Sequence, residues 1–112
     1  MALYIDSAFL NDIMLVTQTV PLAGITTNPS ILLAARERGQ DESPHALLDA
    51  LLRITNGVIF MQPGAGEEEE MYAEALTYIQ AAPKRVIPKI PIFRFPTVVK
   101  ICYTHELRNE MY

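Results

Sequence analysis

Four apolar segments of this sequence each end in, or carry close to their end, a polar side chain that could take part in chemistry. In chain order these side chains are a carboxylate, a hydroxyl with an amide, a second amide and an amine, and they belong to Asp6, Thr26 with Asn28, Gln62 and Lys89. If the segments are parallel strands, the side chains meet at the carboxyl edge of one sheet, where α/β proteins bind their ligands. The sequence therefore predicts one ligand site built from several strand ends.

Lys89 carries the most specific chemical signal of this set. It stands between Ile87-Pro88 and Ile90-Pro91, and apolar neighbours disfavour the charged form of an amine. A neutral lysine amine is a nucleophile that forms a Schiff base with a carbonyl compound. Lys89 is therefore a candidate catalytic nucleophile, although its spacing alone also leaves a non-catalytic role open.

Each of the other candidates also has a purely structural interpretation. Asp6 can cap the first helix or accept hydrogen bonds near it, and Gln62 can be a hydrogen-bonded polar residue at a strand end. The polar residues at 26–28 precede Pro29, so they can cap the helix that follows. The residue types alone leave these alternatives open.

Hydrophobic periodicity places strands and helices in alternation along the chain. We expect strands at 3–7, 22–25, 58–62 and 85–92, and helices at 11–19, 31–38, 44–55 and from the acidic run at 67–70 to Pro83. Pro88 and Pro91 would each remove a ladder hydrogen bond, so the last strand should be irregular or at an edge. Strands that alternate with helices predict an α/β fold with a parallel sheet and right-handed crossovers.

The acidic run Glu67–Glu70 has two interpretations, a cation site and the start of a helix. Carboxylates in a first helical turn complement the helix dipole. Apolar residues then follow at helical spacing, at Tyr72, Ala75, Leu76 and Ile79. A helix start is therefore expected.

The tail at 93–112 fits two structures. Pro96 can open a helix, and apolar residues at 98, 101 and 102 follow at helical spacing, which predicts a helix at about 96–109. The β-branched residues of the same stretch also suit a strand at 97–103.

Composition argues against several classes of function. The 112 residues allow one domain, and they carry a formal net charge of -4 with 9 scattered Lys and Arg, so neither nucleic acid nor an anionic membrane is an expected partner. Cys102, His45 and His105 do not have the spacing of a metal site, and a single cysteine cannot form an internal disulfide. We expect no signal peptide and no membrane span, with the cytosol as the default location.

Four segments resemble a known protein family. PLAGITTNPS at 21–30 resembles the signature of the transaldolase family, most closely its small members of the fructose-6-phosphate aldolase type. LYIDS at 3–7 is similar to the first strand of that family, VIFMQPGA at 58–65 to the third, and VIPKIPI at 86–92 to the strand that carries the Schiff-base lysine. The order and spacing of these segments agree with the family over residues 1–92.

This resemblance implies class I aldolase chemistry on a (β/α)8 barrel. Lys89 would form the imine with a sugar phosphate or a dihydroxyacetone-type donor, and Asp6 would assist the proton transfers. Asn28 with Thr26 would hold donor hydroxyls, and Gln62 would position the substrate or a water. The protonated imine is the electron sink, so the reaction requires neither a metal nor an organic cofactor.

The chain also departs from the family pattern. A complete barrel of this type takes roughly 200 residues or more, so the sequence corresponds to about four β/α units, a half-barrel. Pro88 replaces the β-branched residue expected before the lysine, and the residues after Ile92 diverge. A half-barrel exposes strand edges and an inner face, so a homodimer or larger homo-oligomer is expected to cover them. The alternatives to an enzyme are a non-catalytic, self-associating remnant and a sugar-phosphate binding module without turnover.

Overall fold

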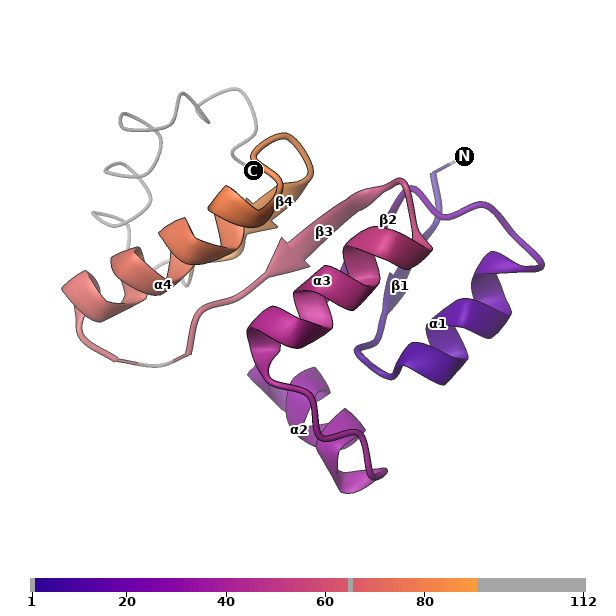
Figure 1. Cartoon of the computed structure of the whole chain (residues 1–112), viewed down its shortest axis with the longest axis horizontal. Helices are drawn as coiled ribbons and strands as arrows, with labels where there is room; N and C mark the ends of the chain where they lie inside the picture. Colours follow the sequence, from indigo (N-terminus) through magenta and orange to yellow (C-terminus); the bar gives the residue numbers. More distant parts are fainter. Residues whose placement is uncertain (1, 65, 91–112) are drawn as a thin grey trace.

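The computed structural model describes residues 2–64 and 66–90, whose strands form one parallel sheet (Figure 1). The strands are β1 (Tyr4–Asp6), β2 (Gly24–Thr26), β3 (Val58–Met61) and β4 (Val86–Pro88), and they lie in the order β1-β2-β3-β4. Because neighbours in the sheet are also neighbours in sequence, right-handed crossovers carry every helix to the same face. The structure confirms the predicted α/β class and parallel sheet, an arrangement compatible with a half-barrel.

The helices begin and end close to the predicted positions. They are α1 (Leu10–Thr17), α2 (Pro29–Glu37), α3 (Pro44–Ile54) and α4 (Glu68–Ala81). Ser43 caps α3, since its Oγ accepts a hydrogen bond from the Ala46 amide at 3.2 Å. Gly39, with φ of 95°, takes the left-handed conformation that ends α2.

β4 is shorter than the predicted strand and lies at an edge of the described sheet. It ends at Pro88, whose missing amide hydrogen lies on the side away from β3, and β3 is its one neighbour in the described sheet, so the edge position predicted from the prolines is confirmed. The remainder of the predicted strand at 91–92 and the tail prediction at 96–109 lie outside the described residues.

The core fills the space between the helices and one face of the sheet. Ile25 and Ile59 on this face are fully buried and pack in one cluster with Leu47, Leu48 and Leu51 of α3, which lies across the sheet (Figure 1). Side chains alternate between faces along a strand, so the residues between these core positions point to the opposite face. Within the described part of the chain, no helix residue is packed into a core cluster on that opposite face.

Helix α4 buries a different stripe from the predicted one. Ala75 and Ile79 are buried as expected, but Met71 and Tyr78 complete the stripe, whereas Tyr72 and Leu76 are only half-buried. The rotation arises because the Tyr78 ring packs against the His45 ring of α3, with centroids 4.8 Å apart. Tyr78 therefore anchors α4 to α3.

Arg85 fastens the end of α3 to the start of β4. Its guanidinium donates to the carbonyl oxygens of Leu52 and Gly57, each at 3.2 Å, and to that of Thr55. The carbonyls at a helix C-terminus carry partial negative charge, which a guanidinium stabilises.

None of the helices in residues 2–64 and 66–90 is both long and apolar enough to cross a membrane.

Candidate active site

The register of the sheet brings the predicted site residues together in two pairs. Asp6 at the end of β1 lies beside Thr26 at the end of β2. Met61 lies beside Pro88, and the Lys89 amide donates to the Met61 carbonyl oxygen at 2.9 Å, so the ladder continues past Pro88. That continuation places Gln62 beside Lys89.

Both pairs lie on the face of the sheet opposite the helices. Thr26 is level with Phe60, and Phe60 with Ile87. Gln62 and Lys89 follow Phe60 and Ile87 by two residues, so the alternation of the strands assigns them to the same face. The structure therefore gathers Asp6, Thr26, Gln62 and Lys89 at the carboxyl edge of one sheet face.

These side chains are accessible to a ligand. Asp6 is exposed, whereas Thr26, Gln62 and Lys89 are half-buried. The hydroxyl of Thr26 donates to the Ile5 carbonyl oxygen at 3.5 Å, which is a weak hydrogen bond. A ligand hydroxyl or phosphate oxygen can therefore compete for Thr26.

Asn28 has the structural role that the sequence also allowed. It is the N-cap of α2, and its Oδ1 accepts a hydrogen bond from the Ile31 amide at 2.9 Å. A contact between Asn28 and a ligand would therefore come from its Nδ2.

Thr27 supports the strand ends from the helix side of the sheet. It is fully buried, and its Oγ1 donates to the Phe60 carbonyl oxygen at 2.8 Å, while its amide donates to the same oxygen at 3.1 Å. Two donors on one carbonyl fix the end of β2 against β3. Thr27 therefore holds the backbone from which Thr26 and Asn28 project.

The sheet separates Asp6 from Lys89. They belong to the two edge strands of the described sheet, β1 and β4. Neighbouring strands are about 4.8 Å apart, so three strand spacings, about 14 Å measured along the sheet, separate Asp6 from Ile87, which is level with it, and Lys89 lies two residues further along its strand. Asp6 and Lys89 of one chain are therefore not in contact.

Gln40 was not recognised from the sequence, although it fixes the loop that follows Asp6. Its Oε1 accepts a hydrogen bond from the Leu10 amide at 2.7 Å, and its Nε2 donates to the Ala8 carbonyl oxygen. Gln40 follows Leu10 by 30 residues and Ala8 by 32, so no local pattern could indicate these partners.

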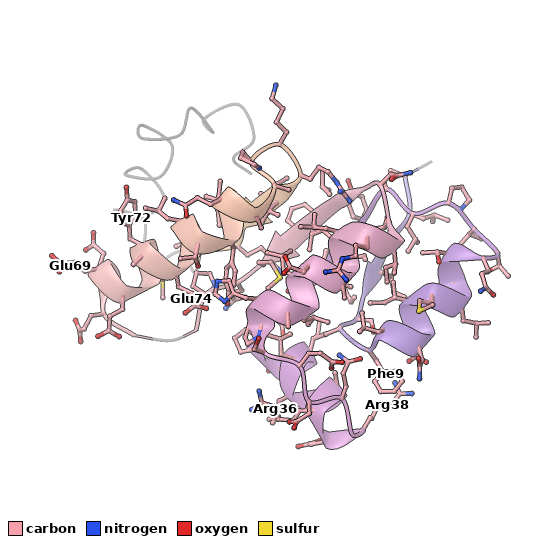
Figure 2. All side chains as sticks on the ribbon, viewed as in Figure 1. Phe9, Arg36, Arg38, Glu69, Tyr72 and Glu74 are labelled. Atoms are coloured by element: carbon pink, nitrogen blue, oxygen red, sulfur yellow. The ribbon has the colours of Figure 1, made fainter. Side chains whose placement is uncertain are left out.

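Glu74 plays the equivalent part for the loop that follows Gln62. This side chain of α4 points toward the loop (Figure 2), and each of its carboxylate oxygens accepts from the Gly64 amide at 3.3 Å. Oε2 also accepts from the Tyr78 hydroxyl at 2.5 Å. Burial raises the pKa of Tyr78 above its usual range, and the Glu74 carboxylate raises it further by accepting the phenol hydrogen.

Tyr78 should make the fold lose stability in alkali. The folded protein keeps the phenol neutral, whereas the unfolded chain ionises it near pH 10, so the unfolded state binds fewer protons above that pH. The free energy of unfolding should therefore fall as pH rises above about 10, and Tyr78→Phe should lessen that slope by up to about 1.4 kcal/mol per pH unit. Urea unfolding at several pH values measures both slopes, and equal slopes would contradict the prediction.

An ion pair joins α1 to the residue that follows α2, away from the candidate site. Arg38 Nη1 lies 2.6 Å from Asp12 Oδ2, and its guanidinium carbon lies 3.7 Å from the centre of the Phe9 ring (Figure 2). The hydrogen bond from Arg38 lowers the pKa of Asp12. Both charged groups are exposed, so this contact contributes little to stability.

An open hollow of about 380 Å³ lies at the opposite end of the fold from the predicted residues. The ends of α1 and α3 line it, with Thr17, Arg53 and Asn56 among the lining residues.

Among the described residues, no group of three or more His, Cys, Asp or Glu could hold a metal ion. No family model matches this chain.

Proposed function

We propose that this chain is a Schiff-base domain of the aldolase or transaldolase type, which acts on a ketose or sugar phosphate. One observation carries the proposal: an amine, a carboxylate, a hydroxyl and an amide gather at the carboxyl edge of one face of a parallel sheet. Ligands of α/β proteins bind at this edge. The transaldolase-like segments quoted above contain all of these residues.

Lys89 is the nucleophile in this proposal. The lone pair of its Nζ attacks the carbonyl carbon of the substrate, and the resulting carbinolamine loses water to form an iminium ion. A base removes the proton of the hydroxyl on the β carbon, the bond between the α and β carbons breaks, and its electron pair moves toward the iminium, so an aldehyde leaves and an enamine remains. In simple cleavage the enamine carbon takes up a proton, and in transfer it adds to a second aldehyde. In both cases water then hydrolyses the resulting iminium, which releases the product and restores the Lys89 amine.

The other residues orient the substrate and move protons. Asp6 acts on the carbinolamine through a bound substrate hydroxyl or a water that bridges the sheet, because it does not contact Lys89 directly, and Thr26 beside it binds a donor hydroxyl. Gln62 lies beside Lys89 by register and positions the substrate or a water next to the imine. Asn28 contributes an amide N–H donor from the start of α2.

Trapping the imine tests the proposal directly. The protein is incubated with dihydroxyacetone or fructose 6-phosphate, reduced with borohydride, and analysed by intact mass and peptide mapping. Hydride addition to the iminium carbon converts it into a stable secondary amine, so one adduct is expected, on Lys89. An adduct on Lys84, an exposed lysine in the turn before β4, would indicate nonspecific modification and contradict the proposal.

A non-catalytic, self-associating domain is the second candidate. The separation of Asp6 from Lys89 within one chain favours it, and so does the use of the Asn28 oxygen as a helix cap. A folded protein that gives no adduct with either substrate would support this candidate over the enzyme.

A further inference from the structure

The hollow of about 380 Å³ lies at the amino edge of the sheet, opposite the edge that carries Lys89. Its lining residues end α1 and α3 or come just before β2 and β3, and both helices run back from the carboxyl edge to the amino edge (Figure 1). None of the described residues that line it belongs to the candidate active site. The hollow is therefore a separate place on the molecule, with a volume in the range of about 300–1,000 Å³ that small-molecule sites occupy.

The two walls of this hollow differ in polarity. The segment between α1 and β2 forms a mainly apolar wall, with Val20, Pro21 and Leu22. The end of α3 and the residues that follow it form a mainly polar wall, with Arg53, Thr55 and Asn56. A ligand that fills the hollow therefore needs an apolar side and a polar side.

Arg53 gives the polar wall a positive charge that no other described residue neutralises. Its guanidinium makes neither an ion pair nor a hydrogen bond in the described part of the chain, and no Asp or Glu belongs to the described lining. The carbonyl oxygens of Leu52, Thr55 and Gly57 at the end of α3 already have a cation of their own, the Arg85 guanidinium. The charge at this wall therefore favours an anion.

Thr55 adds a buried hydroxyl whose hydrogen is unused. The residue is 8% exposed, and its Oγ1 accepts a hydrogen bond from the Gly57 amide at 3.1 Å. The hydroxyl hydrogen has no acceptor among the described residues. A buried polar hydrogen without a partner costs free energy, so a water or a ligand normally accepts it. Because Thr55 lines the hollow, an oxygen of a ligand bound there is such an acceptor.

The polar wall thus offers hydrogen-bond donors together with a positive charge, which is what a carboxylate needs. A carboxylate has two oxygens that accept hydrogen bonds and can pair with a guanidinium through both of them. The Asn56 side chain, which is exposed, supplies a further N–H donor. A phosphate would set some of its oxygens against the apolar wall, where they would lack partners. An aliphatic carboxylate would instead lay its chain on that wall.

The backbone holds both walls in place before a ligand binds. The Val20 amide donates to the Val16 carbonyl oxygen at 2.9 Å, which fixes the chain as it leaves α1. The Thr55 amide donates to the Leu51 carbonyl oxygen at 3.2 Å, which fixes the chain as it leaves α3. A preformed site loses little conformational entropy on binding.

We propose that the hollow between the ends of α1 and α3 binds a small aliphatic monocarboxylate. Its carboxylate lies on Arg53, Thr55 and Asn56, and its chain lies against the wall at 20–22. This site goes beyond the Schiff-base function and does not depend on it.

Titration with hexanoate, followed by amide NMR spectra of the whole chain, tests the proposal. The signals of residues that line the hollow, such as Val20, Thr55 and Asn56, should shift with a Kd of about 1 mM or tighter, which is within the affinity that a ligand of this size can reach. No shift with hexanoate at up to about ten times that concentration would overturn the proposal. Shifts confined to the carboxyl edge around Thr26 and Lys89 would also overturn it.

Substitution of the charged residue tests the polar wall. Arg53→Gln should weaken hexanoate binding by about 10-fold or more, because it removes the charge-assisted hydrogen bonds. Arg36→Gln is the matched control: Arg36 is an exposed arginine in the last turn of α2 and does not line the hollow (Figure 2). The control should bind hexanoate as the unmodified chain does. Equal binding by Arg53→Gln and the unmodified chain would overturn the proposal.

The Thr55 hydroxyl is tested by a pair of variants. Thr55→Val should weaken binding by about 5-fold or more, whereas Thr55→Ser, which keeps the hydroxyl, should bind as the unmodified chain does. Urea unfolding checks that both variants are folded. Equal binding by two folded variants would overturn the role of the hydroxyl.

Two other probes test the class of ligand. Hexanamide has the same chain without the charge and should bind at least about 10-fold more weakly than hexanoate. Inorganic phosphate has the charge without the chain and should also bind more weakly. Hexanamide binding as tight as that of hexanoate would overturn the role of the charge, and phosphate binding as tight would overturn the assignment to an aliphatic carboxylate.

Discussion

Replacing Lys89 with methionine is expected to abolish the borohydride-trapped adduct while the protein stays folded. Methionine has a similar length and fills a half-buried position, but it has no amine to attack a carbonyl carbon. Substitutions away from the core change stability by about 0.5 kcal/mol or less, so the free energy of unfolding should stay close to that of the unmodified chain. Intact mass after reduction and urea unfolding give the two readouts.

Two further lysine variants complete this experiment. Lys84→Met removes an exposed lysine only five residues earlier and should leave the adduct in place. Lys89→Arg keeps the positive charge but cannot lose its proton to become a nucleophile, so it should give no adduct. An adduct that persists in Lys89→Met would remove Lys89 from the chemistry.

Local sequence signals predicted most of the elements because the relevant interactions are local. Ser43 with Pro44, and Asn28 with Pro29, mark helix starts through hydrogen bonds that span three residues. Gly39 marks a helix end through its own dihedral angle. The buried stripe of α4 was predicted wrongly in part, because the position of Tyr78 depends on packing against another helix.

The candidate site likewise contains residues whose positions the sequence could predict and residues whose roles it could not. Strand ends place Asp6 and Thr26 side by side, and the parallel order that follows from alternating strands and helices is enough to predict this. Gln40 fixes the loop that follows β1, and Glu74 fixes the loop that follows β3. No sequence pattern around either residue indicates its hydrogen-bond partners. Their roles became visible only in the folded chain.

Gly57→Ala is expected to cause the largest loss of stability among single substitutions at the glycines. A Cβ at this position would lie 2.3 Å from the Ala23 carbonyl oxygen and 2.6 Å from the Ala23 carbonyl carbon. Both atoms are backbone, so relief requires moving the start of β2 away from β3. The Val58 amide donates to that same Ala23 oxygen at 3.1 Å, and the movement would break this bond.

The cost should exceed about 4 kcal/mol, which is a large part of the 5–15 kcal/mol that typically stabilises a domain. Urea unfolding should therefore show a population that is substantially unfolded without denaturant. Gly64→Ala is the matched control, since its nearest neighbour is a Glu74 side-chain oxygen at 3.8 Å, and it should change stability by about 0.5 kcal/mol or less.

Gly39→Ala separates backbone strain from close contact. Nothing lies within 4 Å of a Cβ there, but φ is +95°, so the variant should lose about 1 to 2 kcal/mol through conformational strain alone. The expected order of destabilisation is thus Gly57, then Gly39, then Gly64. If Gly57→Ala were as stable as Gly64→Ala, the backbone of Ala23 could not approach Gly57 as closely as it does here. The β2–β3 register that sets Thr26 against Phe60 would then have to be revised.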